Sequence, residues 1–278
     1  MIADRTLPGH LPVRVHYPAH LDAPAPIIVF SHGLGGSRLG YGFLAQAWAE
    51  HGYVVVLPSH RENVPAGVAE VEKPSVAELR AMKEAIDDPR NWPKRPLDIR
   101  RTVDALETLP EHVRALAGKL DLSRVGIGGH SYGAYTALLC GGARIRVGDG
   151  WHSYAEPRAK AFLALSPPGN GSRGLSASSW ASIRAPMLCM TGTLDTGVLG
   201  EPASWREDGF RSMPGPDQGL VVIEGADHAT FSGGRLRFPA DPSHLRQIEA
   251  ATSWFWDKHL RGTEAPFPSL PGARVEWK

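Results

Sequence analysis

The chain has little that would tie it to a membrane, to nucleic acid or to a disulfide framework. It contains two cysteines among 278 residues, and its 30 basic and 29 acidic residues leave a formal net charge of +1. No stretch approaches the roughly 20 apolar residues that cross a bilayer, and no basic segment followed by an apolar one opens the chain. We therefore expect no nucleic-acid partner, no stable membrane anchor and a cytoplasmic location, with a secreted protein that has lost its signal as the alternative.

Signals for metals, nucleotides and disulfides are also missing. Cys140 and Cys189 both lie in apolar segments, which favours buried thiols over a disulfide or a metal site. There is no His-Glu-x-x-His motif and no cysteine pair at zinc spacing. The glycine-rich segment 33–36 is not followed by Lys-Ser or Lys-Thr, as a phosphate-binding loop would require. We expect no metal and no cofactor.

What remains is the composition and rhythm of an ordinary globular protein, with 42% hydrophobic and 21% charged residues. Short apolar segments alternate with helical patterns, which predicts an α/β fold with a mainly parallel central sheet and helices on both faces. We expect one domain over 1–278. The expected strands are 13–17, which alternates as a half-exposed strand does, and 27–30, 53–58, 125–128, 161–165, 187–190 and 220–223, and the expected helices are 43–51, 96–109, 134–139 and 245–255.

Residues 59–96 interrupt this rhythm. Ser75-Val76-Ala77-Glu78 forms a capping-box pattern, and the helix that it opens should end at Asp88-Pro89. The segment follows a predicted strand, so we expect a helical insertion at the carboxyl edge of the sheet, where lids over binding sites usually lie. A packed surface helix with no role in access is the alternative.

The segment from Val125 to Tyr135 organises the rest of the chain. Gly129, Ser131 and Gly133 form a G-x-S-x-G pattern between a short apolar strand and a helical pattern. The glycines are needed because the turn is too tight for a Cβ on either side, and the serine must hold a strained backbone. This arrangement exposes the serine hydroxyl above a helix N-terminus, which favours developing negative charge. We therefore predict Ser131 as a catalytic nucleophile.

An acid and a base follow the nucleophile in the expected chain order of serine, acid and histidine. Asp195 follows the strand 187–190, and His228 follows the strand 220–223, so both should lie at the carboxyl edge of the sheet. A histidine must accept the serine proton, and a carboxylate must orient and stabilise that histidine. We predict these roles for His228 and Asp195. The less favoured candidates are His130 and His32 as the base and Asp227 as the acid.

Two backbone N–H groups should bind the developing oxyanion. One belongs to Tyr132, directly after the nucleophile, and the other should come from Leu34 in the His32-Gly33-Leu34 turn. The predicted walls of the substrate pocket are the apolar residues near these turns, namely Leu34, Tyr132, Trp180 and Phe231. Core packing is the alternative for Trp180 and Phe231.

Several motifs together resemble the α/β-hydrolase superfamily over nearly the whole chain. Within it, the chain is similar to the dienelactone-hydrolase-like group that includes platelet-activating-factor acetylhydrolases and cutinase-like polyester hydrolases. This resemblance implies an α/β-hydrolase fold and hydrolysis of carboxylic esters without a cofactor. The chain also departs from these groups at two positions. Dienelactone hydrolases proper have a cysteine where Ser131 stands, and polyester hydrolases often have an aromatic residue at the position of Leu34. The residues that carry the resemblance are 30–36, 57–60, 95–99, 129–133, 179–186 and 225–228.

The sequence as a whole predicts a serine carboxylesterase that acts on small-molecule esters through an acyl-enzyme intermediate. Activity should fall as the pH drops through about 6.5, because a protonated histidine cannot act as a base. The same residues would also serve an acyltransferase or perhydrolase, in which an alcohol or peroxide replaces water, or a polyester hydrolase. A non-catalytic binding module is the least favoured reading. The acyl and alcohol specificity and the oligomeric state are not predicted.

Overall fold

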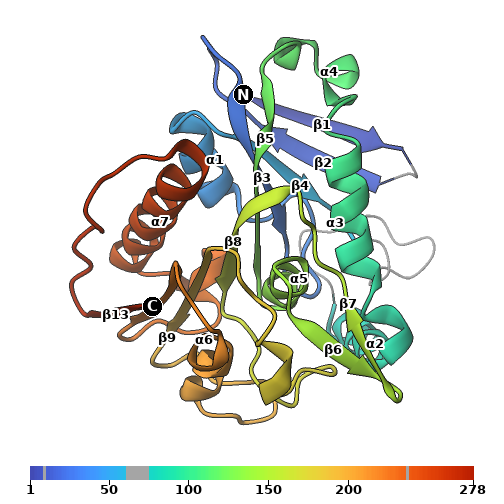
Figure 1. Ribbon diagram of the computed structural model, residues 1–278, viewed down its shortest axis with the longest axis vertical. Coiled ribbons are helices and arrows are strands. Elements are labelled where there is room, and N and C mark those ends of the chain that lie inside the picture. Colours follow the sequence, from blue (N-terminus) through green and yellow to red (C-terminus); the bar gives the residue numbers. More distant parts are fainter. Residues whose placement is uncertain (9–10, 61–74, 236–237) are drawn as a thin grey trace.

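A nine-stranded sheet runs through the centre of the computed structural model, which describes residues 1–8, 11–60, 75–235 and 238–278 (Figure 1). The strand order is β1-β2-β4-β3-β5-β8-β9-β10-β13. The interior strands from β4 to β10 are parallel, whereas β1, β2 and β13 pair antiparallel with their neighbours. The bounds of the nine strands are β1 Ile2–Leu7, β2 Leu11–His16, β3 Ala25–Ser31, β4 Val54–Pro58, β5 Leu120–His130, β8 Ala159–Leu165, β9 Met187–Gly192, β10 Gln218–Ile223 and β13 Ala273–Trp277.

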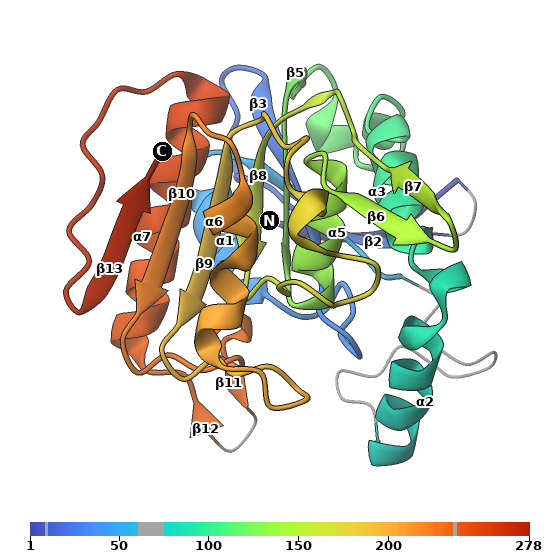
Figure 2. The same ribbon diagram turned by 60° about the horizontal axis from the view of Figure 1, so that its bottom comes forward.

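Helices cover both faces of the sheet, and each face has its own hydrophobic core. One core joins the sheet to α3 and α5 and extends to α6, and the other joins it to α1 and α7 (Figure 2). This arrangement confirms the predicted α/β fold. The helices are α1 Gly42–Glu50, α2 Val76–Asp87, α3 Lys94–Asp104, α4 Leu109–His112, α5 Tyr132–Cys140, α6 Asp208–Ser212 and α7 Pro242–Trp256.

The prediction for the strand at 13–17 holds for one face and is wrong for the other. Val13 and Val15 are fully buried, as the alternation predicts, but His16, on the face expected to be exposed, is only 5% exposed. The reason is its place in the sheet, because β2 pairs with β1 on one side and with β4 on the other. The added N-terminal strand makes β2 an interior strand, which local alternation could not reveal.

The predicted helix at 96–109 is two helices. It begins at Lys94 rather than at Pro96, and α3 ends at Asp104 before α4 begins at Leu109. Leu106 and Leu109 are still buried, so the apolar pattern was read correctly while the helix boundaries were not. The sequence also did not predict β1, β13 or two short hairpins, whose strands are β6 Arg144–Val147, β7 Gly150–Ser153, β11 Gly234–Arg235 and β12 Phe238–Pro239.

The insertion at 59–96 is described only in part. Residues 61–74 and the side chain of Glu78, on which the predicted capping box depends, lie outside the described part of the chain. The helix itself is present as α2, and it ends at Asp87 as expected. Figure 2 shows α2 beyond the body of the sheet, at the end toward which the arrows of β9 and β10 point. Met82 and Ile86 are buried.

Both cysteines are free and buried, which confirms the prediction for Cys140 and Cys189. Burial raises the pKa of each thiol, so neither is activated as a nucleophile. Within the described residues, no helix has the length and apolar character needed to cross a bilayer.

Candidate active site

The turn between β5 and α5 holds Ser131 in a strained backbone conformation, with φ of 57° and ψ of −114°. The strain is enforced by close packing on both sides. A Cβ at Gly129 would stand 2.2 Å from the carbonyl oxygen of Gly133, and a Cβ at Gly133 would stand 2.0 Å from the carbonyl oxygen of Ser31. Only glycine fits at either position, so the local geometry follows from the sequence motif.

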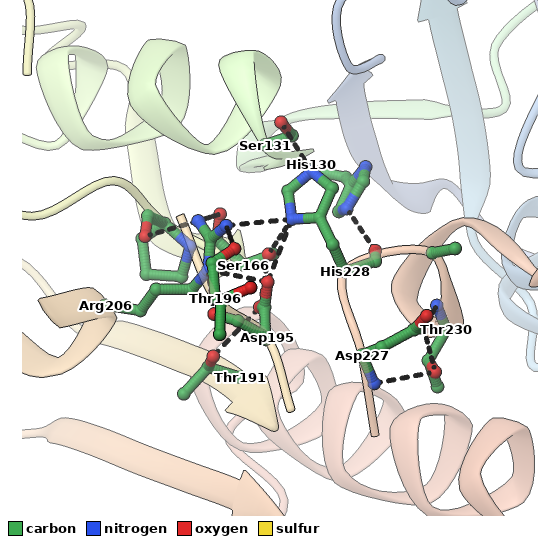
Figure 3. A network of polar contacts seen from close by, with 12 residues as sticks. His130, Ser131, Ser166, Thr191, Asp195, Thr196, Arg206, Asp227, His228 and Thr230 are labelled. Atoms are coloured by element: carbon green, nitrogen blue, oxygen red, sulfur yellow. Dashed lines mark hydrogen bonds and ion pairs between the residues drawn. The ribbon is translucent and has the colours of Figure 1, made fainter. Parts of the chain in front are cut away.

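Ser131, His228 and Asp195 come together at the carboxyl edge of the sheet (Figure 3). Ser131 Oγ lies 2.9 Å from His228 Nε2, and His228 Nδ1 lies 2.9 Å from Asp195 Oδ1. The serine follows β5, the aspartate follows β9 and the histidine follows β10. These parallel strands end at one edge, which is why residues far apart in sequence meet there.

The carboxylate of Asp195 is fully buried and densely hydrogen-bonded. Its Oδ2 accepts hydrogen bonds from the Ser166 hydroxyl and, at 2.9 Å, from the Thr191 hydroxyl. Its Oδ1 lies 2.6 Å from Arg206 Nε, besides its contact with His228. Burial alone would raise the pKa of Asp195, but the His228 hydrogen bond and the Arg206 charge more than offset this, and the pKa is lowered. The carboxylate is therefore kept ionised.

Arg206 was not predicted from the sequence. Its side chain is 4% exposed, and besides its ion pair with Asp195 it donates hydrogen bonds to the carbonyls of Ser166 and Pro167 at 3.1 and 3.2 Å. Its Nη2 lies 3.1 Å from His228 Nδ1. A buried cation thus contacts both Asp195 and His228 (Figure 3). Arg206 lies in a 3₁₀ turn at Ala203–Glu207, where no motif distinguishes it from a surface arginine.

Ser166 was also missed as a site residue. It directly follows β8, and its backbone has a φ of 55°. Its hydroxyl lies 2.7 Å from His228 Nδ1 in addition to its bond to Asp195. The signal that could have revealed it is its position, since it ends a parallel strand at the same edge as the other site residues.

The less favoured candidates for acid and base have other partners. His130 Nε2 donates to the carbonyl oxygen of His228 at 3.1 Å, and His130 Nδ1 lies 2.8 Å from the Tyr41 hydroxyl. Burial, aided by the nearby His228, lowers the pKa of His130 well below its usual range. Asp227 Oδ1 accepts hydrogen bonds from the backbone and hydroxyl of Thr230, both at 2.9 Å. Both residues therefore hold the loop that carries His228.

A cavity of about 690 Å³ opens over Ser131 and His228. Leu34 and Tyr132 line it, as predicted, and Lys83 and Ile86 bring α2 to its wall. Trp180 and Phe231, also predicted as pocket walls, are fully buried and belong to the two hydrophobic cores. Neither is among the residues that line the cavity, so the core-packing alternative holds for both.

In the ranges that the structure describes, no group of three or more histidine, cysteine, aspartate or glutamate side chains is placed to hold a metal ion.

Comparison with known proteins gives a consistent picture. The family described as platelet-activating factor acetylhydrolase, isoform II, matches residues 7–92. The platelet-activating factor acetylhydrolase of Cavia porcellus is 27% identical over 168 residues, which is 51% of this chain and 38% of the relative. That of Bos taurus is 28% identical over 155 residues, which is 45% of this chain and 35% of the relative. The matched part is thus well under half the length of these curated relatives.

Solved structures match over nearly the whole chain. A protein from Klebsiella pneumoniae that is assigned as a dienelactone hydrolase has a TM-score of 0.69 at 18% identity, covering 93% of this chain and 99% of that one. A ferulic acid esterase from Streptomyces cinnamoneus has a TM-score of 0.66 at 17% identity, covering 99% of this chain and 94% of that one. The α/β-hydrolase fold and the predicted resemblance to the dienelactone-hydrolase-like group are confirmed.

Proposed function

We propose that this protein is a serine carboxylesterase that hydrolyses carboxylic esters of small molecules through an acyl-enzyme intermediate. One observation carries the proposal, namely the hydrogen-bond chain from Asp195 through His228 to Ser131 beneath an open cavity. A free serine hydroxyl is too weak a nucleophile to attack an ester, and this chain supplies the base that it needs. The hydrolase and esterase names of its relatives support the same reaction class.

The steps follow from the donor and acceptor roles in the chain. Ser131 Oγ attacks the ester carbonyl while its proton passes to His228 Nε2. The resulting imidazolium gives that proton to the leaving alkoxide, and an acyl group remains on Ser131. A water molecule then attacks the acyl carbon while one of its protons passes to His228. The bond between the acyl carbon and Ser131 Oγ breaks, His228 returns the proton to Oγ, and the carboxylic acid is released. Asp195 accepts the Nδ1 proton of His228 in a hydrogen bond throughout and stabilises the imidazolium, which suits a carboxylate that the His228 hydrogen bond and the Arg206 charge keep ionised.

The oxyanion that forms during attack needs fixed donors. We assign the backbone N–H groups of Tyr132 and Leu34 to this role. Tyr132 is the first residue of α5, where the helix N-terminus favours negative charge, and Leu34 lines the same cavity. Losing one such donor typically lowers turnover by about a hundred- to a thousandfold.

The proposal is tested with p-nitrophenyl esters of increasing acyl length and the variant Ser131→Ala. We expect the variant to lose at least about a thousandfold in kcat, because no nucleophile remains. Ser232→Ala is the matched control, since Ser232 also lines the cavity but its hydroxyl, among the described residues, bonds to the nearby carbonyl of Ala229 alone, at 2.9 Å. Unchanged hydrolysis by Ser131→Ala, or an equal loss in both variants, would contradict the proposal. The acyl series also measures the substrate range directly.

A further inference from the structure

Three donors converge on a single backbone carbonyl behind the cavity. The carbonyl oxygen of Gly33 accepts a hydrogen bond from the ring Nδ1 of His32 at 2.7 Å and from the backbone N–H of Gly36 at 3.2 Å. Arg95 adds a longer contact from Nη2 at 3.4 Å, while its Nη1 donates to the carbonyl of His32. A carbonyl oxygen has two lone pairs, whereas three donors surround this one. The donors therefore fix the direction of the carbonyl as well as satisfying a buried acceptor.

The ring of His32 is fixed in one tautomer. Its Nε2 lies 3.2 Å from the backbone N–H of His60, which can only donate, so Nε2 carries no proton and Nδ1–H must point at Gly33. His32 is 2% exposed, and burial together with the charge of Arg95 holds its pKa well below the usual range. The neutral donor therefore persists over the whole working pH range.

The other side of Gly33 is held as well. Its N–H donates to the Tyr41 hydroxyl at 3.1 Å, and that hydroxyl lies 2.8 Å from Nδ1 of His130. His130 in turn donates to the backbone carbonyl of His228. The turn is thus fixed at both peptide groups of Gly33, and one of these links reaches the loop of the proposed base.

The orientation of the next N–H follows from the planarity of the peptide. In a trans peptide the C=O and N–H bonds point in opposite directions. The Gly33 carbonyl faces His32 and Arg95 in the interior, so the N–H of Leu34, in the same peptide, faces the opposite way. That direction is toward the cavity, which Gly33 and Leu34 line. Arg95 is fully buried, and its guanidinium also lies 4.4 Å from the ring centre of Tyr132.

We propose that His32 and Arg95 are positioning residues that hold the Gly33–Leu34 peptide with its N–H aimed at the developing oxyanion. This inference rests on the proposed esterase function, and it goes beyond that function by assigning the donor's orientation to two side chains that touch no substrate. Arg95 connects the two halves of the oxyanion site, since it contacts the Gly33 carbonyl and the ring of Tyr132. The charge of Arg95 also polarises the peptide, which strengthens its N–H as a donor.

The test compares His32→Leu with His32→Asn. An asparagine Nδ2 can occupy the place of the ring Nδ1 and donate to Gly33, whereas leucine has no donor. We expect His32→Leu to lower kcat by about 10- to 100-fold with KM changed by less than about threefold, because the donor acts mainly in the transition state. His32→Asn should recover at least half of this loss on a logarithmic scale.

A second readout separates positioning from general destabilisation. Trifluoromethyl ketones form a tetrahedral anionic adduct with an active serine, whereas the matching methyl ketones bind mainly as ground-state analogues. The affinity of His32→Leu for the trifluoromethyl ketone should fall by about the same factor as kcat, and its affinity for the methyl ketone should not. Arg95→Lys keeps the charge but replaces the two nitrogens of the rigid guanidinium by one, so it should show the same selective loss. This variant provides the test if His32→Leu folds poorly.

Thr252→Ala is the stability control, because it removes the hydrogen bond between Thr252 and Trp48 in the core on the other face of the sheet. It should lower the melting temperature without changing the ratio of the two ketone affinities. The inference is overturned if His32→Leu and Arg95→Lys lose kcat only in proportion to their folded fraction, or if His32→Asn is as impaired as His32→Leu. The esterase proposal would survive that result, since it is tested separately by the comparison of Ser131→Ala with Ser232→Ala.

Discussion

Arg206 places a buried positive charge against Asp195 and His228 together. Its ion pair with Asp195 is almost entirely removed from solvent, with side-chain exposures of 4% and 0%. The charge of Arg206 is one of the causes that lower the pKa of Asp195, after the hydrogen bond from His228. Arg206 therefore holds both the position and the charge of this carboxylate.

Replacing Arg206 by methionine should lower kcat by about tenfold or more, because Asp195 loses the ion pair that fixes its position against His228 and helps to keep its carboxylate ionised. The measurement is kcat with a saturating ester at pH 8. Arg211→Met is the control, since Arg211 pairs with Glu276 at the surface. An Arg206→Met variant that keeps the kcat of the parent protein would contradict this role of Arg206.

The two aspartates beside His228 should respond very differently to removal of charge. Asp195→Asn should lower kcat by about three to four orders of magnitude, because the amide cannot hold the required imidazole tautomer or stabilise the imidazolium. Asp227→Asn should stay within about threefold of the parent, since Asp227 bonds only to Thr230 among the contacts described. Initial rates at saturating ester decide between them. A loss in Asp227→Asn that equals the loss in Asp195→Asn would reassign the acid.

At the scale of the single residue, sequence reasoning selected those residues that lie in a distinctive local pattern. Ser131 lies in a motif that its glycines enforce, and Asp195 and His228 each follow an apolar strand. Arg206 has no such signature, because it reaches the site from a 3₁₀ turn and only its side chain makes the contact. Trp180 was placed in the pocket because it is apolar and near a site turn, but its indole donates to Asn170 within the core.

The nucleophile turn is the element on which the site depends. Gly133→Ala should destabilise the protein by about 1–3 kcal/mol and reduce activity, because the new Cβ meets rigid backbone at Ser31 and the turn must open. Gly42→Ala is the matched control, since a Cβ at Gly42 in α1 meets nothing within 4 Å. That change should be neutral or stabilising by up to about 1 kcal/mol. Urea unfolding of both variants tests this prediction, and equal stability of the two would contradict it.

At the scale of elements, apolar periodicity predicted the interior strands and the major helices. It failed where pairing partners decide the outcome. β2 is buried because β1 covers its outer edge, and β13 forms by pairing with β10 rather than by a strong pattern of its own. The break between α3 and α4 was missed because the buried positions Leu106 and Leu109 continue the apolar spacing across it.

The whole molecule buries several histidines in the neutral state. Burial, with the nearby Arg14, lowers the pKa of His16 to about 4, and burial lowers that of His259 to about 4. The pKa values of His32 and His130 are also well below the usual range, mainly because of burial. In the unfolded chain these groups take up protons near pH 6.5. The unfolded state then binds more protons than the folded one, so stability is complete above pH 6.5 and is lost as the pH falls toward 4.

The free energy of unfolding should therefore fall by about 1 kcal/mol or more per pH unit between pH 6.5 and 4.5. Urea titrations at four pH values across this window measure it. His16→Gln should flatten the slope, because the neutral amide removes one proton-binding group from the unfolded chain. His152→Gln, at an exposed position, should leave the slope unchanged. A parent protein whose stability is constant over this window would contradict the prediction.

The most direct test of the account is where a fluorophosphonate attaches. The account predicts one adduct per chain by intact mass, located by peptide mass spectrometry on Ser131, with labelling slowed at least about a hundredfold in His228→Ala, which lacks the base. An adduct on another residue, or no adduct in a folded protein that still hydrolyses esters, would contradict the central claim that the hydroxyl of Ser131 is the nucleophile.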